Sequence, residues 1–408
     1  MNDYFANALS VLKDWIKIKS VKSKPTKNAP FGKGVSKMLS KALSDAENLG
    51  FETKNYDGFI GEVVFGSGND RDGLAVLCHL DVVPEGDLSL WNVSPYSAVE
   101  KDGYLYGRGV VDDKGAAALC LFALKELKDE GFVPSKKIKL ILGCDEESGW
   151  GCIDHYNEVA VMPKIGFSPD GEFPVTYAEK GIYHVKYSFP ISKAVKSVLG
   201  GDRINVVCDK AQVTIDGQDY NFSGVSAHGS TPELGDNAIK KALKFLVEKG
   251  LFREEVYENL FSGRLFEKFK DESGILTFSP NVIKKVGENV EVFVDVRYPV
   301  HYTLSEVDGA LKKIGEYEVI EHKKPLYADK NGALVQTLNS VYEKHTGEKA
   351  ISQTTGGGTY ARALELGVAF GPSLGKDLCC HVPNERMKIE DLKLCYAIYK
   401  DAIKELSK

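Results

Sequence analysis

Two mainly apolar runs on either side of a long helical segment limit the folds that this chain can adopt. The runs "GLAVLCHLDVV" (residues 73–83) and "KKIKLILGC" (residues 136–144) predict buried strands. Between them, "KGAAALCLFALKELKDEG" (residues 114–131) predicts a helix that ends at a glycine. This order is typical of an α/β sheet covered by helices, in which functional side chains gather beyond the carboxyl ends of the strands.

The pattern changes after about residue 181. Alternating segments there predict strands at "GIYHVKYSF", "AQVTIDG", "GILTFSP" and "VEVFVDVRYPV", and helices at "DNAIKKALKFLVEKG" and "LSEVDGALKKIG". From about residue 325, "NGALVQTLNSVYEKHTG" and "GTYARALELG" predict helices around short strands. The predicted fold class is α/β: a catalytic domain (residues 1–180 and 325–408) with a mixed sheet covered by helices on both faces, and an inserted α+β lid domain (residues 181–324).

Composition excludes several classes of function. The formal net charge is -6, and no basic patch with interleaved aromatic residues points to nucleic acid. No apolar stretch is long enough to span a bilayer, and the amphipathic N-terminus makes a poor signal peptide, so we expect a cytoplasmic protein. The eight cysteines contain no Cys-x-x-Cys pair, which indicates reduced thiols and not a disulfide framework or a structural zinc site.

Acids and histidines stand where the predicted strands and helices begin or end. His79 and Asp81 are two positions apart, so on a strand they would share a face; a core histidine with an acceptor beside it is the plain alternative. Asp112 and Asp113 precede the long helix, although capping a helix needs only one aspartate.

Three further positions belong with these acids. "CDEESGWG" places Glu146 and Glu147 beside Asp145 after an apolar strand, where adjacent carboxylates repel one another unless a cation is bound. Asp170 lies in "FSPDGEFPV", where a simple turn aspartate is the alternative, and His381 lies in "CCHVPNERM", in a loop before a final helix.

Taken together and in order, these motifs resemble the family of co-catalytic zinc metallopeptidases. That family contains PepV-type dipeptidases, carnosinases, aminoacylases and succinyl-diaminopimelate desuccinylase. The matching segments are "HLDVVP", "GRGVVDDKG", "DEESGWG", "SPDGEFP", "SAHGSTPELGDNA", "DVRYP", "GGGTYAR" and "CHVPNE". They extend from residue 79 to residue 385, and they look most like the PepV-type dipeptidases, although this chain is shorter than a typical one.

The resemblance implies a site for two divalent metal ions. His79 and Asp170 would bind one ion, Glu147 and His381 the other, and Asp112 would bridge both. One imidazole per ion among oxygen donors suits zinc first, with manganese or cobalt as alternatives.

The resemblance also assigns roles around the ions. Asp81 would orient His79, and Glu146 would be the general base that takes a proton from a water shared by the metals. The peptide bond between Asp112 and Asp113 is expected to be cis.

The substrate side is predicted less directly. His228 looks like a lid histidine that stabilises the oxyanion, and Asn205 is a loose match to a substrate-contacting lid asparagine. Arg297 could grip a carboxylate with its fork, and the alternative is a structural ion pair, for example with Asp295. A turn rich in glycine opens a predicted helix and would offer N–H groups to an anion. Its residues are Gly356, Gly357 and Gly358.

These expectations describe a metal-dependent dipeptidase or short-peptide peptidase, either a monomer or a homodimer through the lid. One alternative is a deacylase of N-acyl amino acids, of the acetylornithine or succinyl-diaminopimelate type, with the same metals and a different pocket. Another is a catalytically silent ligand-binding relative, which the presence of every expected ligand and of Glu146 argues against.

Overall fold

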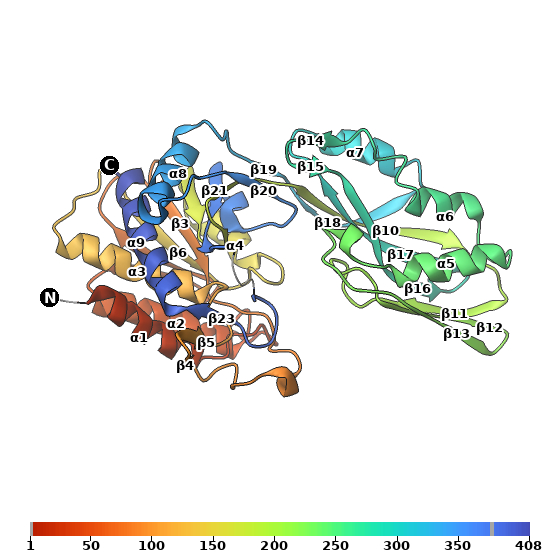
Figure 1. The fold of residues 1–408 in the computed structure, drawn as a ribbon, viewed down its shortest axis with the longest axis horizontal. Helices are drawn as coiled ribbons and strands as arrows, with labels where there is room; N and C mark the ends of the chain where they lie inside the picture. Colours follow the sequence, from red (N-terminus) through yellow and green to blue (C-terminus); the bar gives the residue numbers. More distant parts are fainter. Residues whose placement is uncertain (1–2, 376–378) are drawn as a thin grey trace. The chain divides into compact units, whose positions relative to one another are not determined.

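The computed structural model describes residues 3–375 and 379–408, and the chain divides into two compact units (Figure 1). Unit 1 comprises Met1–Tyr177, Tyr327–Gln353 and Thr359–Lys408. Unit 2 comprises Ala178–Leu326 and Thr354–Gly358. The sequence placed residues 354–358 with the catalytic domain, whereas this short segment groups with unit 2.

Unit 1 is built on a mixed sheet. Within the described residues the sheet has nine strands, in the order β1-β2-β6-β3-β7-β21-β9-β19, with β20 paired to β9. The four central strands β6, β3, β7 and β21 run parallel, and antiparallel strands flank them. The strand bounds are β1 (Glu52–Tyr56), β2 (Ile60–Phe65), β3 (Leu74–His79), β6 (Ile138–Gly143), β7 (Ile165–Ser168), β9 (Val175–Glu179), β19 (Leu326–Tyr327), β20 (Gln353–Thr355) and β21 (Leu366–Phe370).

Helices cover both faces of this sheet, which confirms the predicted fold class. Side chains alternate between faces along a strand, so Gly61 and Glu62 in β2 point in opposite directions. A Cβ on Gly61 would meet α2, whereas Glu62 accepts a hydrogen bond from Tyr156 of α4. The helices of unit 1 are α1 (Tyr4–Ile16), α2 (Lys33–Asn48), α3 (Lys114–Asp129), α4 (Gly151–Val159), α8 (Ala333–Thr346) and α9 (Ile389–Leu406).

Two small sheets tie distant parts of unit 1 together. One has the order β23-β5-β4, and in the other β22 pairs with β8. Their bounds are β4 (Val99–Lys101), β5 (Tyr104–Tyr106), β8 (Gly171–Glu172), β22 (Pro372–Ser373) and β23 (Arg386–Lys388). Through these pairings the late part of the chain returns to the segments that precede α3 and follow β7.

Unit 2 has an antiparallel sheet with helices, as an α+β domain should. The sheet order is β13-β12-β11-β16-β17-β10-β18, and β14 pairs with β15. The strands are β10 (Gly181–Pro190), β11 (Val195–Gly200), β12 (Lys210–Ile215), β13 (Gln218–Ser223), β14 (Lys270–Asp271), β15 (Gly274–Ile275), β16 (Thr277–Val286), β17 (Asn289–Tyr298) and β18 (Tyr317–Lys323). The helices are α5 (Ala238–Glu248), α6 (Glu254–Phe261) and α7 (Leu304–Leu311).

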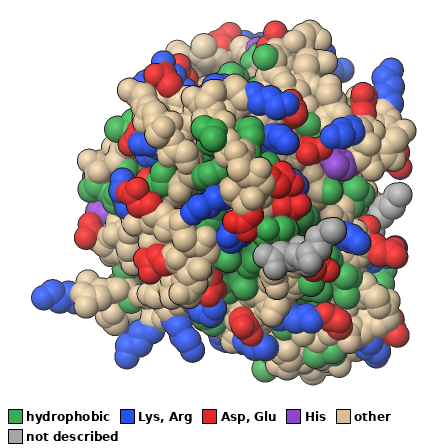
Figure 2. Space-filling model, turned by 90° about the vertical axis from the view of Figure 1, so that its left-hand side faces the viewer, with side chains coloured by type: hydrophobic (Ala, Val, Ile, Leu, Met, Phe, Trp, Pro, Cys, Tyr) green, Lys and Arg blue, Asp and Glu red, His purple; other side chains and the backbone are tan. Residues whose placement is uncertain are grey.

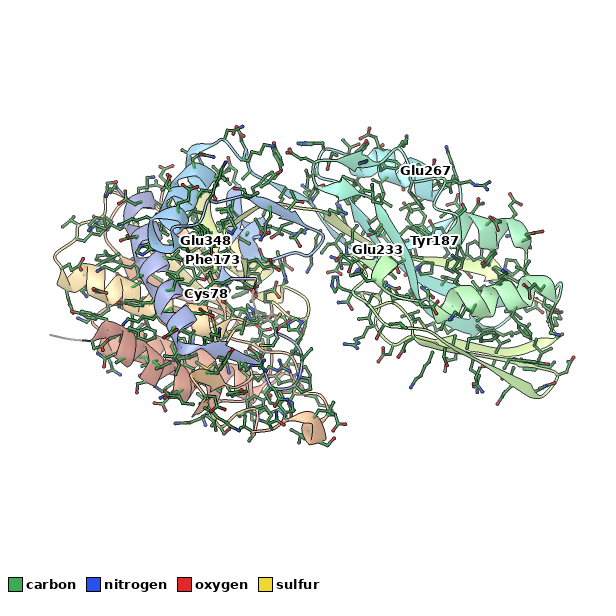
Figure 3. All side chains as sticks on the ribbon, in the orientation of Figure 1. Cys78, Phe173, Tyr187, Glu233, Glu267 and Glu348 are labelled. Carbon is green, nitrogen blue, oxygen red and sulfur yellow. The ribbon has the colours of Figure 1, made fainter. Side chains whose placement is uncertain are left out.

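Each unit has its own aromatic core (Figure 3). In unit 1, the ring of Phe173 meets that of Phe370 edge to face, with centroids 4.8 Å apart. In unit 2, Tyr187 stacks on Phe189 with centroids 5.6 Å apart. Cys78 is fully buried and its thiol contacts that of Cys120 in α3, on the opposite face of β3 from His79.

The surface is mixed in charge. Figure 2 shows one face of the molecule, on which acidic and basic side chains are interspersed. Among the described residues, no helix is both long and apolar enough to cross a membrane.

One predicted helix is wrong. "GTYARALELG" forms a short 3-10 turn (Tyr360–Ala363), whose first N–H groups are capped by Thr359, and then enters β21. Gly367 explains the change, because a Cβ there would lie 2.2 Å from the carbonyl oxygen of Ala361. The end of this segment therefore joins the sheet, although its alanine and leucine content favoured a helix.

We predict that Gly143→Ala destabilises unit 1. A Cβ at this strand position would lie 2.3 Å from the ring of the buried Tyr360, and overpacking typically costs about 1–3 kcal/mol. The melting temperature, followed by circular dichroism, should fall by several degrees. Gly309→Ala in α7 is the control: nothing lies within 4 Å of the added Cβ, so stability should hold or rise. Equal melting temperatures for both variants would contradict the packing argument.

Candidate active site

The predicted acids and histidines of unit 1 meet at the carboxyl ends of three adjacent parallel strands. β6, β3 and β7 are neighbours in that order. His79 is the last residue of β3, and Asp170 follows β7. Glu146 and Glu147 follow β6 in the turn before α4, and Asp112 precedes α3. The βαβ order therefore brings together side chains that are far apart in the sequence.

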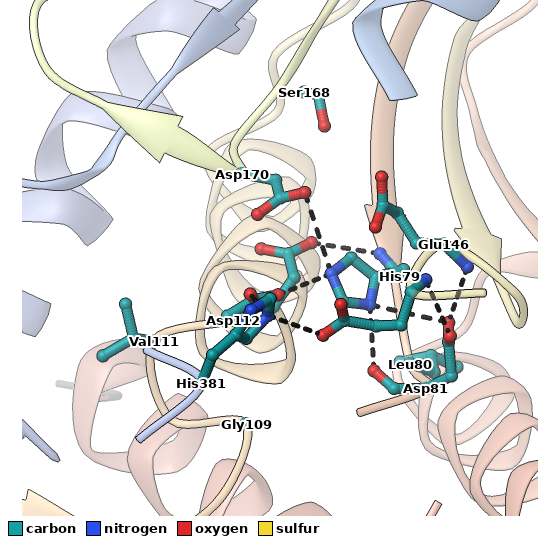
Figure 4. A network of polar contacts seen from close by, with 12 residues as sticks. His79, Leu80, Asp81, Gly109, Val111, Asp112, Glu146, Ser168, Asp170 and His381 are labelled. Atoms are coloured by element: carbon teal, nitrogen blue, oxygen red, sulfur yellow. Dashed lines mark hydrogen bonds and ion pairs between the residues drawn. The ribbon is translucent and has the colours of Figure 1, made fainter. Parts of the chain in front are cut away.

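Asp112 lies between the two imidazoles (Figure 4). Its Oδ1 is 2.7 Å from Nε2 of His79, and its Oδ2 is 2.9 Å from Nε2 of His381. Each imidazole also faces a second acid: Asp170 Oδ2 is 3.7 Å from His79 Nε2, and Glu147 Oε1 is 3.0 Å from His381 Nε2. One carboxylate thus stands between two pairs, each made of one histidine and one acid.

The buried ring of His79 is held in one orientation. Its Nδ1 donates to the main-chain carbonyl oxygen of Asp81 at 2.9 Å. Because a carbonyl only accepts, Nδ1 carries a hydrogen, and the Nε2 that faces the acids can offer its lone pair to a cation. Ligand atoms within 4.8 Å of one another form two groups. They are His79, Glu146 and Asp170, and His79, Asp112 and Glu147.

Asp81 differs from its expected arrangement. β3 ends at His79, so Asp81 lies beyond the strand and does not share a strand face with the histidine. Its carboxylate Oδ1 is 3.5 Å from His79 Nδ1, farther than the main-chain carbonyl. The carboxylate instead accepts the N–H groups of Glu146 at 3.1 Å and Glu147 at 3.2 Å. The carboxylate of Asp81 therefore holds the main chain of the turn that carries Glu146 and Glu147.

The acids next to the site have other partners. Asp113 follows a cis peptide bond from Asp112, as expected, and its Oδ2 accepts the N–H of His79 at 3.0 Å instead of capping α3. Asp145 pairs with Lys22 at 2.6 Å and accepts the N–H of Gly151 in the first turn of α4. These two carboxylates hold the main chain of the site and do not face its centre.

Burial, followed by repulsion between neighbouring acids, determines the pKa values of the acids in the site. Burial and the charge of Asp112 raise the pKa of Asp170 to about 7 and also raise the pKa of Glu147. Burial and the charge of Asp170 raise the pKa of Glu146 well above its usual value. Burial opposes protonation of His381, but its hydrogen bonds to Asp112 and Glu147 raise its pKa to about 12. Protons on the imidazoles thus supply positive charge that bound cations would supply instead.

Several predicted substrate-side residues lie together within unit 2. The loop with Asn205 bonds the loop with His228, because the carbonyl of Asn205 accepts the N–H of Gly229 at 2.7 Å. Nδ1 of His228 is 2.7 Å from the hydroxyl oxygen of Ser230. A Cβ on Gly356 would lie 2.6 Å from Cβ of the same serine, so the glycine turn packs against the histidine loop.

Arg297 makes the ion pair that the sequence left as its alternative role. Its Nε and Nη2 donate to the two carboxylate oxygens of Asp295 at 2.7 and 3.0 Å, and the side chain is buried. Its Nη1 donates to the carbonyl oxygen of Gly356 at 3.0 Å. Within the glycine turn, the N–H of Gly357 is bonded to Thr355 Oγ1 at 3.1 Å, so this donor has an internal partner.

Sequence reasoning missed two charged residues that help to hold the loop carrying Asp112. Glu385 accepts main-chain N–H groups of the loop before α3, and Arg108 pairs with it at 2.7 Å. Both belong to motifs that also carry predicted ligands, "GRGVVDDKG" and "CHVPNE". Both side chains are almost fully buried, which no sequence pattern shows.

Comparison with known proteins gives the same assignment over nearly the whole chain. The model of peptidase family M20/M25/M40 matches residues 75–405. A putative dipeptidase, YtjP of Bacillus subtilis, is 36% identical, over 97% of this chain and 96% of the relative. A Beta-Ala-Xaa dipeptidase of Lactobacillus delbrueckii subsp. lactis is 32% identical, over 94% of this chain and 92% of the relative.

A solved structure shares the fold. Human carnosine dipeptidase 1 superposes with a TM-score of 0.64 and 15% identity, covering 99% of this chain and 96% of that one. Sequence, site geometry and fold therefore agree, and the chain belongs to peptidase family M20/M25/M40.

Proposed function

We propose that this chain is a metal-dependent dipeptidase that hydrolyses dipeptides or short peptides. The observation that carries the proposal is the position of Asp112, whose two oxygens face two imidazoles that each have a further acid. A carboxylate in this position can bridge two cations, one on each side. The relatives named as dipeptidases, which match over nearly their full length, support a peptide substrate.

The donor set fits two divalent cations. His79 with Asp170 would hold one ion, His381 with Glu147 the other, and Asp112 would be shared. Three carboxylates balance most of the charge of two divalent ions, and one imidazole per ion favours zinc while admitting manganese or cobalt. The imidazole N–H that His79 donates to Asp81 leaves its other nitrogen available as a ligand atom.

Glu146 is the proposed general base. When bound, the two cations would polarise the scissile carbonyl and lower the pKa of the attacking water. Glu146 would accept the proton of that water and pass it to the departing amine nitrogen. The turn that carries Glu146 is fixed by the carboxylate of Asp81, so the base has a defined position before substrate arrives.

The first test concerns the substrate and the metal together. Exhaustive chelation should abolish hydrolysis of a dipeptide panel, and zinc, manganese or cobalt should restore it, because in the proposed mechanism the cations lower the pKa of the attacking water and polarise the carbonyl. Released amino acids and the metal content of the same samples should both be measured. Hydrolysis of N-acyl amino acids but not of dipeptides would favour the deacylase alternative, and full activity of metal-free protein would exclude the mechanism.

A second test separates the base from a ligand. Glu146→Gln should retain two cations but lose about 100-fold or more in kcat, because an amide cannot accept the proton. Glu147→Gln is the matched control, since the main-chain N–H of this neighbouring residue is bonded to the same Asp81 carboxylate. It should lose bound metal as well as activity. Normal turnover by Glu146→Gln would show that another group is the base.

A third test asks whether Arg297 binds substrate or only Asp295. If its remaining N–H groups bind the terminal carboxylate of a dipeptide, Arg297→Ala should lower kcat/KM for free dipeptides by roughly 30-fold or more. C-terminally amidated dipeptides, which lack that carboxylate, should be affected far less. Equal losses on both substrates would leave Arg297 with the structural ion pair alone.

A further inference from the structure

Glu385 is a fully buried acid that holds a loop distant in the sequence. Its Oε1 accepts the N–H groups of Gly109 and Val111 at 3.0 Å each, and that of Asp112 at 3.4 Å. Its own main-chain carbonyl accepts the N–H of Gly107 at 3.0 Å. The loop that presents Asp112 is therefore gathered around one carboxylate oxygen.

Arg108 completes this arrangement from within the same loop. Its Nη1 donates to the other oxygen of Glu385 at 2.7 Å, and both side chains are almost entirely buried. Its Nη2 donates to the carbonyl oxygen of Pro84, in the segment that follows His79. Its guanidinium also lies over the ring of Trp91, 5.3 Å from the centroid. The pair thus joins three segments that carry proposed ligands.

The position of Glu385 in the chain gives this contact a consequence for the site. Glu385 closely follows His381, and the turn between them is anchored because Asn384 donates to the carbonyl of Leu90 and accepts the N–H of Asn92. The same short segment therefore presents one proposed ligand and binds the main chain of another. A change at Glu385 would therefore act on the segments of both Asp112 and His381.

We propose that Glu385 is a positioning residue that sets the separation of Asp112 from His381, and thereby the affinity of the site for the cation that these two residues would share. This inference rests on the proposed function. Residues that orient metal ligands typically change metal affinity by about 10–100-fold when they are replaced. The effect on affinity distinguishes this role from a contribution to folding stability alone.

Glu62 provides a matched control within unit 1. It is also fully buried, pairs with the buried Lys139 at 3.1 Å, and accepts a hydrogen bond from Tyr156. Its partners belong to β1, β6 and α4 and are not proposed metal ligands. Replacing either glutamate by glutamine keeps the shape and removes one buried charge, so both variants should lose stability.

The experiment measures Co²⁺ binding to the metal-free protein by calorimetry and by the visible absorption of the bound ion. Glu385→Gln should bind one of two Co²⁺ ions at least tenfold more weakly and change its absorption spectrum, because the amide places a donor against either Arg108 or the loop N–H groups. Glu62→Gln should bind both ions within about twofold of the unchanged protein, at a similar loss of melting temperature.

The outcomes are distinct. Unchanged Co²⁺ affinity and spectrum in a folded Glu385→Gln variant would overturn the positioning role while leaving the proposed function intact. Failure of the unchanged protein to bind Co²⁺ would overturn both. If Glu385→Gln does not fold, Arg108→Met is the deciding variant, because it removes the ion pair of the Glu385 carboxylate. This variant should also bind one of the two Co²⁺ ions about tenfold more weakly.

Discussion

The cost of burying several carboxylates close to one another is the constraint on which the site of unit 1 depends. The parallel strands β6, β3 and β7 bring their carboxyl ends together, and each end supplies an acid or a histidine. Without compensation, burying Asp112, Glu147 and Asp170 in one place would be strongly unfavourable. The imidazoles of His79 and His381 supply part of that compensation through hydrogen bonds.

The loops that carry these side chains hold one another through a second set of acids. Asp81, beside His79, accepts the N–H groups of the turn after β6. Asp113 accepts the N–H of His79. Glu385 accepts the N–H of Asp112. Each loop thus gives a carboxylate to the main chain of another, which satisfies buried donors and fixes the geometry at the same time.

The sequence predicted what depends on strand order and local motif. His79 and Glu147 could be placed together because the βαβ pattern sends consecutive strand ends to one edge of a sheet, whereas Asp112 was added by the resemblance to the peptidase family. The Asp295 pair of Arg297 could be offered only as an alternative, because spacing does not show whether a side-chain fork is already occupied.

Other features depend on contacts that no local pattern contains. The segment after Thr359 was predicted as a helix because its composition favours one, and the close approach of Gly367 to Ala361 places it at the sheet instead. The bond from Glu385 to the loop before α3 joins residues that only the folded chain brings together. The pairing of β23 with β5 has a consequence for biosynthesis, since it carries His381 and Glu385 back to a sheet formed from much earlier residues. During translation, the segment with His79 leaves the ribosome long before the one with His381, so the set of proposed ligands stays incomplete on the nascent chain. A metal site of the proposed composition would be completed only after the segment with β23 has been synthesised and has paired with β5.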